Sequence, residues 1–590
     1  MTAPLQYRIC ALDPAAHLFA VTCTVAGPAA GGQLFSLPAW IPGSYMIRDF
    51  ARHIVAIRAE AGGRAVALEK LDKQTWRAAP VPGGQALSVH CEVYAWDLSV
   101  RSAHLDRTHG FFNGSSVFLR VHGQEHCPCE VDILPPADAE LADWRVITAM
   151  PPAGGVRSHA FGRYRAADYE ELIDHPVEMG RFTVYAFEAA GVAHEIALSG
   201  RHDCDGERLC ADLARICQWQ IDLFGAPPPM DYYAFLTMVV GEGYGGLEHR
   251  ASTALLTSRA DLPWQGMKVP TDGYRQFLGL CSHEYFHTWN VKRIKPAAFV
   301  PYDLSRENHT ALLWAFEGFT SYYDDLALVR SGVIGVDDYL GLLGKSISAV
   351  LRGPGRKRQS LAESSFDAWT KYYRQDENTP NEVVSYYAKG ALVALALDLQ
   401  LRAAGQGGSL DEVMRVLWRR HGSGTPGVPE DGIFAAVAEV GGTALARWLR
   451  RAVEGTADLP LARLLKPFGI GWRAAAAAAL PWLGVKFASG AAEARLATVY
   501  SDAPAQRAGL AAGDVLVAID GLKAATANAV DALLGRRRPG ERVQVHAFRR
   551  DELMCFEVEL GVPPADQVTL AALPRASVAA QQLRRAWLGQ

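Results

Sequence analysis

The residues best suited to chemistry are two histidines and a glutamate in the segment His283-Glu284-Tyr285-Phe286-His287. In a helix, residues four apart differ by about 40° around the axis and by about 6 Å along it, so both imidazoles can face one point. Paired imidazoles of this kind bind zinc at about 2.0–2.1 Å. Glu284 borders that point without having to bind the metal. It therefore stands where a general base for a zinc-bound water should be.

A catalytic zinc takes three protein ligands and keeps a fourth position for water. A third histidine six residues after the motif is excluded, because Arg293 occupies that position. We expect Glu317 to be the third ligand. It is predicted to border the apolar stripe of a second helix, where a carboxylate needs a cationic partner. This single set of three ligands predicts one catalytic zinc ion. The alternative ligands, in a more polar and loop-like stretch, are Asp303, Glu307 and His309.

The helix that carries the motif is predicted to run from Tyr274 to Ile294. Thr271 or Asp272 provides an N-cap, and Pro296 ends the helical pattern. Lys292 falls in the predicted last turn, where a positive charge complements the helix dipole. The motif is therefore expected in the middle of the helix.

The composition narrows the class of protein. The chain has 590 residues, of which 49% are hydrophobic, and a net charge of −4. These values exclude wholesale disorder and argue against a nucleic-acid or membrane partner. The first residues do not form a basic segment followed by an apolar core, and ten scattered cysteines contain no Cys-x-x-Cys pair. We expect free thiols and a cytoplasmic protein without a transmembrane segment.

Hydrophobic patterning changes along the chain. Residues 1–195 read as short strands separated by turns, and residues 272–453 read as mainly helical. Residues 481–561 are again rich in strands, and the tail 563–590 is predicted to be helical. The individual predictions are strands at Phe19–Val25, Leu87–Ala95, Ser116–Val121, Arg181–Phe187 and Tyr232–Val240, and a helix at Leu209–Phe224.

Further motifs flank the histidines in a fixed order. They are Gly245-Gly246-Leu247-Glu248-His249, Glu317-Gly318-Phe319 and Tyr387-Ala388-Lys389-Gly390. With them the sequence resembles the gluzincin metallopeptidases of the aminopeptidase N type. It is most similar to the glycyl aminopeptidase family that carries a C-terminal PDZ domain. Trp40–Asp49 and Asp174–Gly180 look like the N-terminal module of that family. His249 differs from the asparagine that aminopeptidase N-type enzymes have there.

The resemblance implies roles for several residues. Glu248 would bind the free α-amino group of a peptide, and Gly245 and Gly246 would let the substrate backbone approach an edge strand. Tyr387 would donate its phenol to the developing oxyanion, with Tyr386 as the alternative. Tyr45 would reach the substrate from the N-terminal module. Independently of the resemblance, Asp324 lies seven residues after Glu317 on the same predicted helix face and would orient a ligand histidine, although a solvated Asp324-Asp325 pair is an equal alternative.

The resemblance also implies a multi-domain α+β fold. Residues 1–195 would form an antiparallel β module, 196–460 a thermolysin-like, mainly helical gluzincin catalytic domain, and 475–562 a PDZ domain. In the PDZ domain, Leu483-Gly484-Val485 would bind a peptide C-terminus, unless the groove is closed and the module serves packing alone.

The expected function is a zinc aminopeptidase that removes small N-terminal residues, Gly or Ala, from peptides. Peptides with a free N-terminus are the expected partners. Two alternatives stay open: a zinc endopeptidase, and a PDZ-type peptide-binding protein with a silent metal site.

Overall fold

The structure is a computed structural model that describes residues 3–405, 407–476 and 480–589. It divides into two compact units. The first contains residues up to Asn308 together with Tyr323–Ile334 and Met414–Pro429, and the second contains the remaining residues. Among the described residues, no helix has both the length and the apolar composition needed to cross a membrane. The described residues include all ten cysteines, and these are free thiols.

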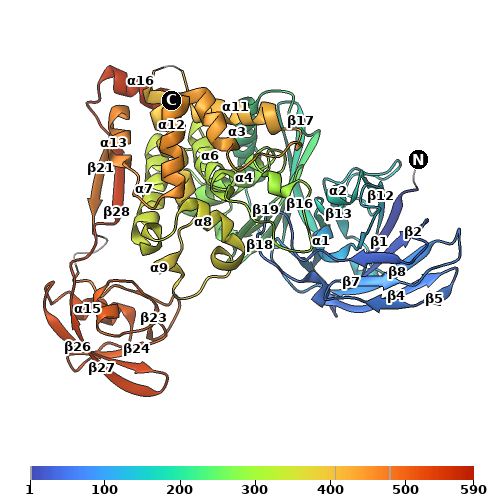
Figure 1. The fold of residues 1–590 in the computed structure, drawn as a ribbon, viewed down its shortest axis with the longest axis horizontal. Helices are drawn as coiled ribbons and strands as arrows, with labels where there is room; N and C mark the ends of the chain where they lie inside the picture. Colours follow the sequence, from blue (N-terminus) through green and yellow to red (C-terminus); the bar gives the residue numbers. More distant parts are fainter. Residues whose placement is uncertain (1–2, 406, 477–479, 590) are drawn as a thin grey trace. The chain divides into compact units, whose positions relative to one another are not determined.

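The first part of the chain is rich in strands (Figure 1). Its largest sheet has the order β14-β12-β1-β2-β8-β4-β5 and is antiparallel apart from the β1–β12 pair. Side chains of β8 alternate between buried and more exposed positions, as expected for a sheet with one covered face. The strands are β14 (Gly162–Ala166), β12 (Cys129–Leu134), β1 (Leu5–Asp13), β2 (Leu18–Val25), β8 (Leu87–Tyr94), β4 (Ile54–Ala61) and β5 (Arg64–Val66).

Two four-stranded sheets complete this part. One contains β13 (Arg145–Ile147), β15 (Val177–Gly180), β10 (His109–Phe112) and β9 (Ala103–Leu105). The other contains β11 (Arg120–Val121), β3 (Gln33–Ser36), β7 (Thr75–Ala78) and β6 (Leu68–Lys70). The predicted strand Ser116–Val121 is wrong at its start, where the short helix α1 (Gly114–Val117) stands. The Ser116 hydroxyl donates to Asn113 O at 2.7 Å, and such local side-chain bonds favour a turn over a ladder.

A fourth sheet and three further helices belong to the first unit. The sheet order is β16-β17-β18-β20-β19, so β19 lies at an edge. Helix α4 packs on α3 and on β19 and β20, which places the histidine motif beside the edge strand. The elements are β16 (Phe182–Ala189), β17 (Val192–Ser199), β18 (Tyr232–Val240), β19 (Tyr244–Glu248), β20 (Ser252–Ser258), α2 (Tyr169–Ile173), α3 (Gly206–Phe224) and α4 (Asp272–Phe286).

The motif helix is shorter than predicted. The Thr271 side chain caps its start, but α4 ends at Phe286 with His287 as C-cap. His287 Nδ1 donates to Asn290 O at 2.6 Å, and this bond draws the chain out of the helical path. Lys292 then forms an ion pair with Asp174 instead of lying in a last helical turn. The motif therefore occupies the end of the helix and not its middle.

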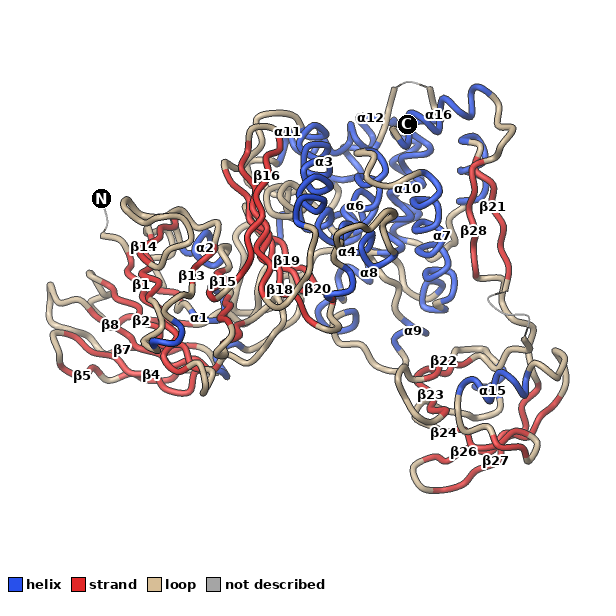
Figure 2. Tube along the Cα trace, turned by 180° about the vertical axis from the view of Figure 1, so that it is seen from behind, coloured by secondary structure: helices blue, strands red, loops and turns tan. Residues whose placement is uncertain are grey.

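The second unit is mainly helical up to residue 465 (Figure 2). Two glycines bring α5–α6 and α10 close together, because a Cβ added at Gly318 would lie 2.6 Å from Gly390 Cα. Helix α6 continues into the first unit. Helix α11 (Leu410–His421) likewise begins in the second unit and continues into the first. The other helices are α5 (Leu313–Phe316), α6 (Gly318–Arg330), α7 (Val336–Arg352), α8 (Leu361–Phe366), α9 (Thr379–Glu382), α10 (Ala388–Ala403), α12 (Gly432–Glu454) and α13 (Leu461–Leu465).

The tail is only partly helical, in contrast to the prediction. Residues Gln567–Ala572 form strand β28, which pairs with β21 (Ile470–Ala475) as a two-stranded ribbon packed on α7 (Figure 2). Helix α16 (Val578–Leu588) follows, and its buried Trp587 donates through Nε1 to Tyr322 Oη at 2.9 Å. Packing of alternate residues on α7 explains the strand, since Val568 and Leu570 are both buried.

In the sequence, the segment between β21 and β28 forms a PDZ-like module with its own apolar core. Its strands and helices are β22 (Val485–Phe487), β23 (Ala494–Val499), α14 (Pro504–Arg507), β24 (Val515–Ile519), β25 (Leu522–Lys523), α15 (Ala527–Leu534), β26 (Arg542–Arg549) and β27 (Glu552–Glu559). The predicted fold class, a multi-domain chain with an N-terminal β module, a helical central part and a C-terminal PDZ domain, is confirmed.

Candidate metal centre and peptide site

The two motif histidines point the same ring nitrogen at each other. His283 Nδ1 lies 3.1 Å from Asp324 Oδ2, and His287 Nδ1 donates to Asn290 O. Their Nε2 atoms are 3.1 Å apart. With both Nδ1 atoms acting as donors, both Nε2 atoms carry lone pairs that face one another. Such an arrangement is stable only with a proton or a cation between the two nitrogens.

The donor set fits a zinc ion. Two ligands at about 2.0–2.1 Å from a tetrahedral metal lie about 3.3 Å apart, close to the observed nitrogen separation. The bond between Asp324 and His283 is the carboxylate–histidine pair that commonly fixes the tautomer of a metal ligand. The predicted orienting role of Asp324 therefore has a geometric basis.

Glu284 and Glu248 lie beside this pair of nitrogens. Glu248, Glu284 and His287 each place one oxygen or nitrogen within 4.8 Å of the others. Both glutamates are almost fully buried, with 4% of Glu248 and 5% of Glu284 exposed. A Cβ atom added at Gly246 would overlap the Glu284 carboxylate. Because Gly246 has no side chain, the edge strand leaves the space that the Glu284 carboxylate occupies.

Glu248 is the last residue of β19 and is enclosed by the N-terminal module. A Cβ atom at Gly43 would lie 2.6 Å from both carboxylate oxygens of Glu248, so the loop around Gly43 covers this side chain closely. Glu248 Oε1 accepts no hydrogen bond from any residue that the structure describes. A buried carboxylate oxygen without a donor favours a cationic ligand, such as an ammonium group.

Asp174 joins the chain after Glu248 to the chain after His287. Its carboxylate lies 3.1 Å from His249 Nδ1 and 2.6 Å from Lys292 Nζ, and it accepts from Arg250 N at 3.1 Å. Burial by itself would raise the pKa of Asp174, but Lys292 and His249 hold this pKa well below its usual value. Asp174 is therefore a buried carboxylate anion stabilised from three sides.

The second unit contributes Glu317 and Tyr387. Glu317 stands between α5 and α6 and is buried. A Cβ atom at Gly318 would lie 3.0 Å from Tyr386 O, so the start of α6 touches the segment that carries the two tyrosines. Burial, together with Tyr373 and Glu317, raises the pKa of Tyr386 well above its usual value. Tyr387 Oη lies 3.2 Å from Tyr373 Oη.

Other predicted residues have more ordinary surroundings. Tyr45 is buried, and its ring stacks on Phe299 at 5.8 Å between centroids. Gly245 is part of the edge strand, and the nearest heavy atom to an added Cβ is Arg101 Nη1 at 3.7 Å. The Arg101 guanidinium also donates to Gly246 O at 3.3 Å.

Sequence reasoning missed Asp174, Lys292 and Gly43 as parts of the site. The sequence predicts Lys292 in the last turn of a helix, which gives no reason to expect its ion pair with Asp174. The positions of Asp174 and Gly43 in conspicuous segments, Asp-His-Pro and Ile-Pro-Gly-Ser, were the available signals. Neither segment indicates by itself which part of the chain it contacts.

Comparisons with known proteins extend these observations. A crystal structure of an aminopeptidase N family protein from Idiomarina loihiensis is 43% identical, with a TM-score of 0.94, and the alignment covers 99% of this chain and 100% of that chain. An M1 zinc metallopeptidase from Deinococcus radiodurans is 14% identical, with a TM-score of 0.49, over 78% of this chain and 95% of that chain.

A curated sequence also matches over a short region. It is a probable periplasmic serine endoprotease, DegP-like, from Hahella chejuensis, 35% identical over 86 residues, or 15% of this chain. The chain spans only 18% of the length of that relative.

Three family models match separate parts of the chain. Residues 6–181 match the peptidase M61 N-terminal domain, residues 276–393 match the M61 glycyl aminopeptidase model, and residues 481–560 match a PDZ domain. The M61 matches include the histidine motif, Glu317 and Tyr387 in one segment and Gly43 and Asp174 in the other. With the Idiomarina loihiensis relative aligned over nearly the whole chain, these matches show that the chain belongs to the M61 glycyl aminopeptidase family of metallopeptidases.

Proposed function

We propose that the protein is a zinc aminopeptidase in which His283, His287 and Glu317 hold one zinc ion. The facing Nε2 atoms of the histidines support the first two ligands. The position of Glu317 directly before α6 supports it as the third ligand, because α6 also carries Asp324. Asp324, which contacts His283, and Glu317 are seven residues apart, close to two helical turns, and so share a helix face.

Zinc at this position supplies Lewis acidity toward the scissile carbonyl and toward a water molecule. Glu284 accepts a proton from the attacking water and delivers it to the leaving amine. Its burial beside Gly246 holds the carboxylate in one position for both transfers. The Tyr387 hydroxyl donates a hydrogen bond to the oxyanion that develops on the substrate carbonyl.

Glu248 makes the enzyme an exopeptidase. The observation that carries this proposal is the buried Glu248 Oε1, which lies near Glu284 and accepts no hydrogen bond from any described residue. A free α-ammonium group satisfies that oxygen, and the loop around Gly43 blocks any extension of the substrate beyond it. The family's glycyl aminopeptidase activity supports a preference for small N-terminal residues, Gly or Ala.

The PDZ domain is proposed to bind the C-terminus of a peptide. Gly484 has a φ of 81° in the Leu483-Gly484-Val485 loop. A glycine with positive φ lets successive backbone N–H groups converge on a carboxylate, which is the recognition mode of PDZ domains. Peptides would thus contact the protein at two places, with the N-terminus at Glu248 and a C-terminus at the PDZ loop.

The test compares free and N-acetylated Gly- and Ala-anilides with wild-type enzyme and Glu248→Gln. We expect the wild type to prefer the free amines, and Glu248→Gln to lose about 10- to 100-fold in kcat/KM on them, the value of a buried charge-assisted bond. Equal cleavage of acetylated and free substrates by the wild type would favour an endopeptidase. If zinc-loaded protein turned over neither the free nor the acetylated substrates, a peptide-binding protein with a silent metal site would be favoured.

A further inference from the structure

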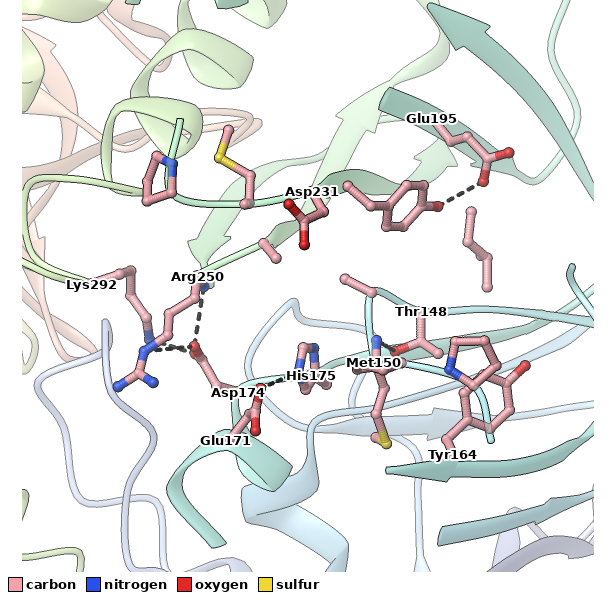
Figure 3. Close-up of a pocket in the computed structure, with 18 of the residues that line it drawn as sticks. Thr148, Met150, Tyr164, Glu171, Asp174, His175, Glu195, Asp231, Arg250 and Lys292 are labelled. Carbon is pink, nitrogen blue, oxygen red and sulfur yellow. Dashed lines mark hydrogen bonds and ion pairs between the residues drawn. The ribbon is translucent and has the colours of Figure 1, made fainter. Parts of the chain in front are cut away.

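Four charged or polar residues, three of them buried, form a cluster next to the proposed ammonium site. They are Asp174, His249, Arg250 and Lys292, here named the Asp174 cluster. Figure 3 shows Asp174 with Arg250 and Lys292 at one end of a cavity of about 800 Å³. Only 8% of Asp174 and 5% of Lys292 is exposed, so their ion pair has little screening by solvent.

The two oxygens of Asp174 hold the turn that follows Glu248. Oδ1 contacts the His249 ring, and Oδ2 accepts from the Arg250 backbone N–H. These are the first two residues after the proposed ammonium ligand. A displacement of either one moves the end of β19, and with it the Glu248 side chain.

The same carboxylate also holds the chain that follows the second histidine. Lys292 Nζ lies 2.6 Å from Asp174 Oδ1, and Lys292 N donates to His287 O at 3.1 Å. Asp174 is therefore the shared anchor of two short segments, one leading to Glu248 and the other to His287. It comes from a third segment, which follows α2 in the part of the chain matched by the M61 N-terminal model.

We infer that Asp174 is a positioning residue that sets the separation between Glu248 and the histidine pair, and thereby the peptide bond that is cleaved. The inference rests on the proposed aminopeptidase function. In an enzyme that removes a single residue, the distance from the ammonium site to the metal ligands must match one amino-acid unit. A buried anion bonded to both segments fixes that distance without touching the substrate.

The neighbouring carboxylates do not make the same connection. Glu171 accepts from Ala167 N and lies 3.8 Å from His175 Nε2 (Figure 3). Glu170 pairs with the Arg250 and Lys295 side chains, at 2.8 and 3.1 Å. Neither side chain bonds the backbone after Glu248 among the described residues. Glu170→Gln is therefore a matched control that removes one nearby charge and leaves the anchor in place.

The experiment measures kcat and KM on Gly- and Ala-anilides for the full-length wild type, Asp174→Asn and Glu170→Gln. Dissociation constants for the dipeptide Gly-Gly are measured in the same three chains carrying Glu284→Gln. We expect Asp174→Asn to raise KM and the Gly-Gly dissociation constant about tenfold or more, with kcat and zinc content much less affected. Glu170→Gln is expected to stay within about twofold.

A pair of substitutions at His249 tests the same anchor by a milder change. The side-chain amide of His249→Asn can replace the Nδ1 donor to Asp174, whereas His249→Leu cannot. We expect His249→Asn to keep the wild-type KM and His249→Leu to raise it. The inference is overturned if Asp174→Asn and His249→Leu both bind Gly-Gly as tightly as their controls do. The binding measurement decides this inference separately from turnover, on which the proposed function depends.

Discussion

Gly246 and Glu284 are in direct contact, with no room for a Cβ atom between the edge strand and the Glu284 carboxylate. Gly245, its neighbour in β19, has ordinary space around it, since an added Cβ would come no closer than 3.7 Å to another heavy atom. Two adjacent glycines thus differ sharply in what they permit. The difference follows from the alternation of a strand, in which neighbouring residues face opposite sides of the sheet.

Gly246→Ala is expected to displace Glu284 and to lower kcat/KM by about 100-fold or more, in the range of a lost general base. Gly241→Ala, at a position where an added Cβ would meet no heavy atom within 4 Å, is the control and should stay within about fivefold of the wild type. Anilide turnover together with zinc analysis distinguishes the two variants. Similar activities for both would show that the contact with Glu284 has no part in the reaction.

Glu284→Gln keeps the shape of the side chain but removes its ability to accept a proton. We expect kcat to fall by about 100- to 10,000-fold, with zinc content and thermal midpoint unchanged. Single-turnover kinetics on a Gly-anilide measure the effect on the chemical step. A kcat near the wild-type value would require another base, and the proposed role of Glu284 would be abandoned.

Tyr387→Phe removes one proposed donor to the oxyanion. The loss of such a donor costs about 100- to 1,000-fold in rate. Tyr386→Phe is the appropriate comparison, because the Tyr386 hydroxyl is buried and next in sequence. We expect only Tyr387→Phe to lower kcat strongly. A loss of less than about tenfold for Tyr387→Phe, or a larger loss for Tyr386→Phe, would assign the oxyanion contact elsewhere.

His194 links stability to pH. Burial lowers the pKa of His194 to about 4, although its bond to the Val192 carbonyl opposes this effect. Its Nε2 accepts from Tyr285 Oη at 2.9 Å, which ties β17 to the motif helix. Because the folded pKa lies below the unfolded value of about 6.5, the unfolded state binds more protons between these values. The contribution of His194 is therefore complete above pH 6.5 and is lost toward pH 4, by about 3 kcal/mol.

We expect His194→Gln to flatten the fall in thermal midpoint between pH 7 and pH 4.5 compared with the wild type. The exposed His126 provides the control, and His126→Gln should follow the wild-type curve. Parallel pH profiles for wild type and His194→Gln would contradict the buried, neutral state of this ring.

Sequence patterns located most of the fold because each was a local property of the chain. The strand Tyr232–Val240 and the helix ending at Phe224 follow directly from periodicity and from the prolines after the helix. The motif helix was predicted too long, since the bond from His287 to Asn290 that ends it depends on a side-chain geometry that periodicity does not encode. The tail was predicted as helix alone because its strand exists only through pairing with β21, almost one hundred residues earlier.

The site was predictable where chemistry needs fixed spacing, as it does for His283, Glu284 and His287. It was not predictable where distant segments meet. Gly43 covers Glu248, and Asp174 joins two turns, through contacts between residues at least 75 positions apart in the sequence. No pattern within a single segment records such contacts.

The proposed zinc site depends most directly on Glu317 as the third ligand. The decisive measurement is the zinc content of purified, dialysed protein by inductively coupled plasma mass spectrometry, for wild type, Glu317→Gln and Glu307→Gln. We predict about one zinc per chain in the wild type and in Glu307→Gln, and a zinc content well below one per chain after dialysis in Glu317→Gln. Full zinc occupancy in Glu317→Gln, or its loss in Glu307→Gln, would contradict the proposed ligand set.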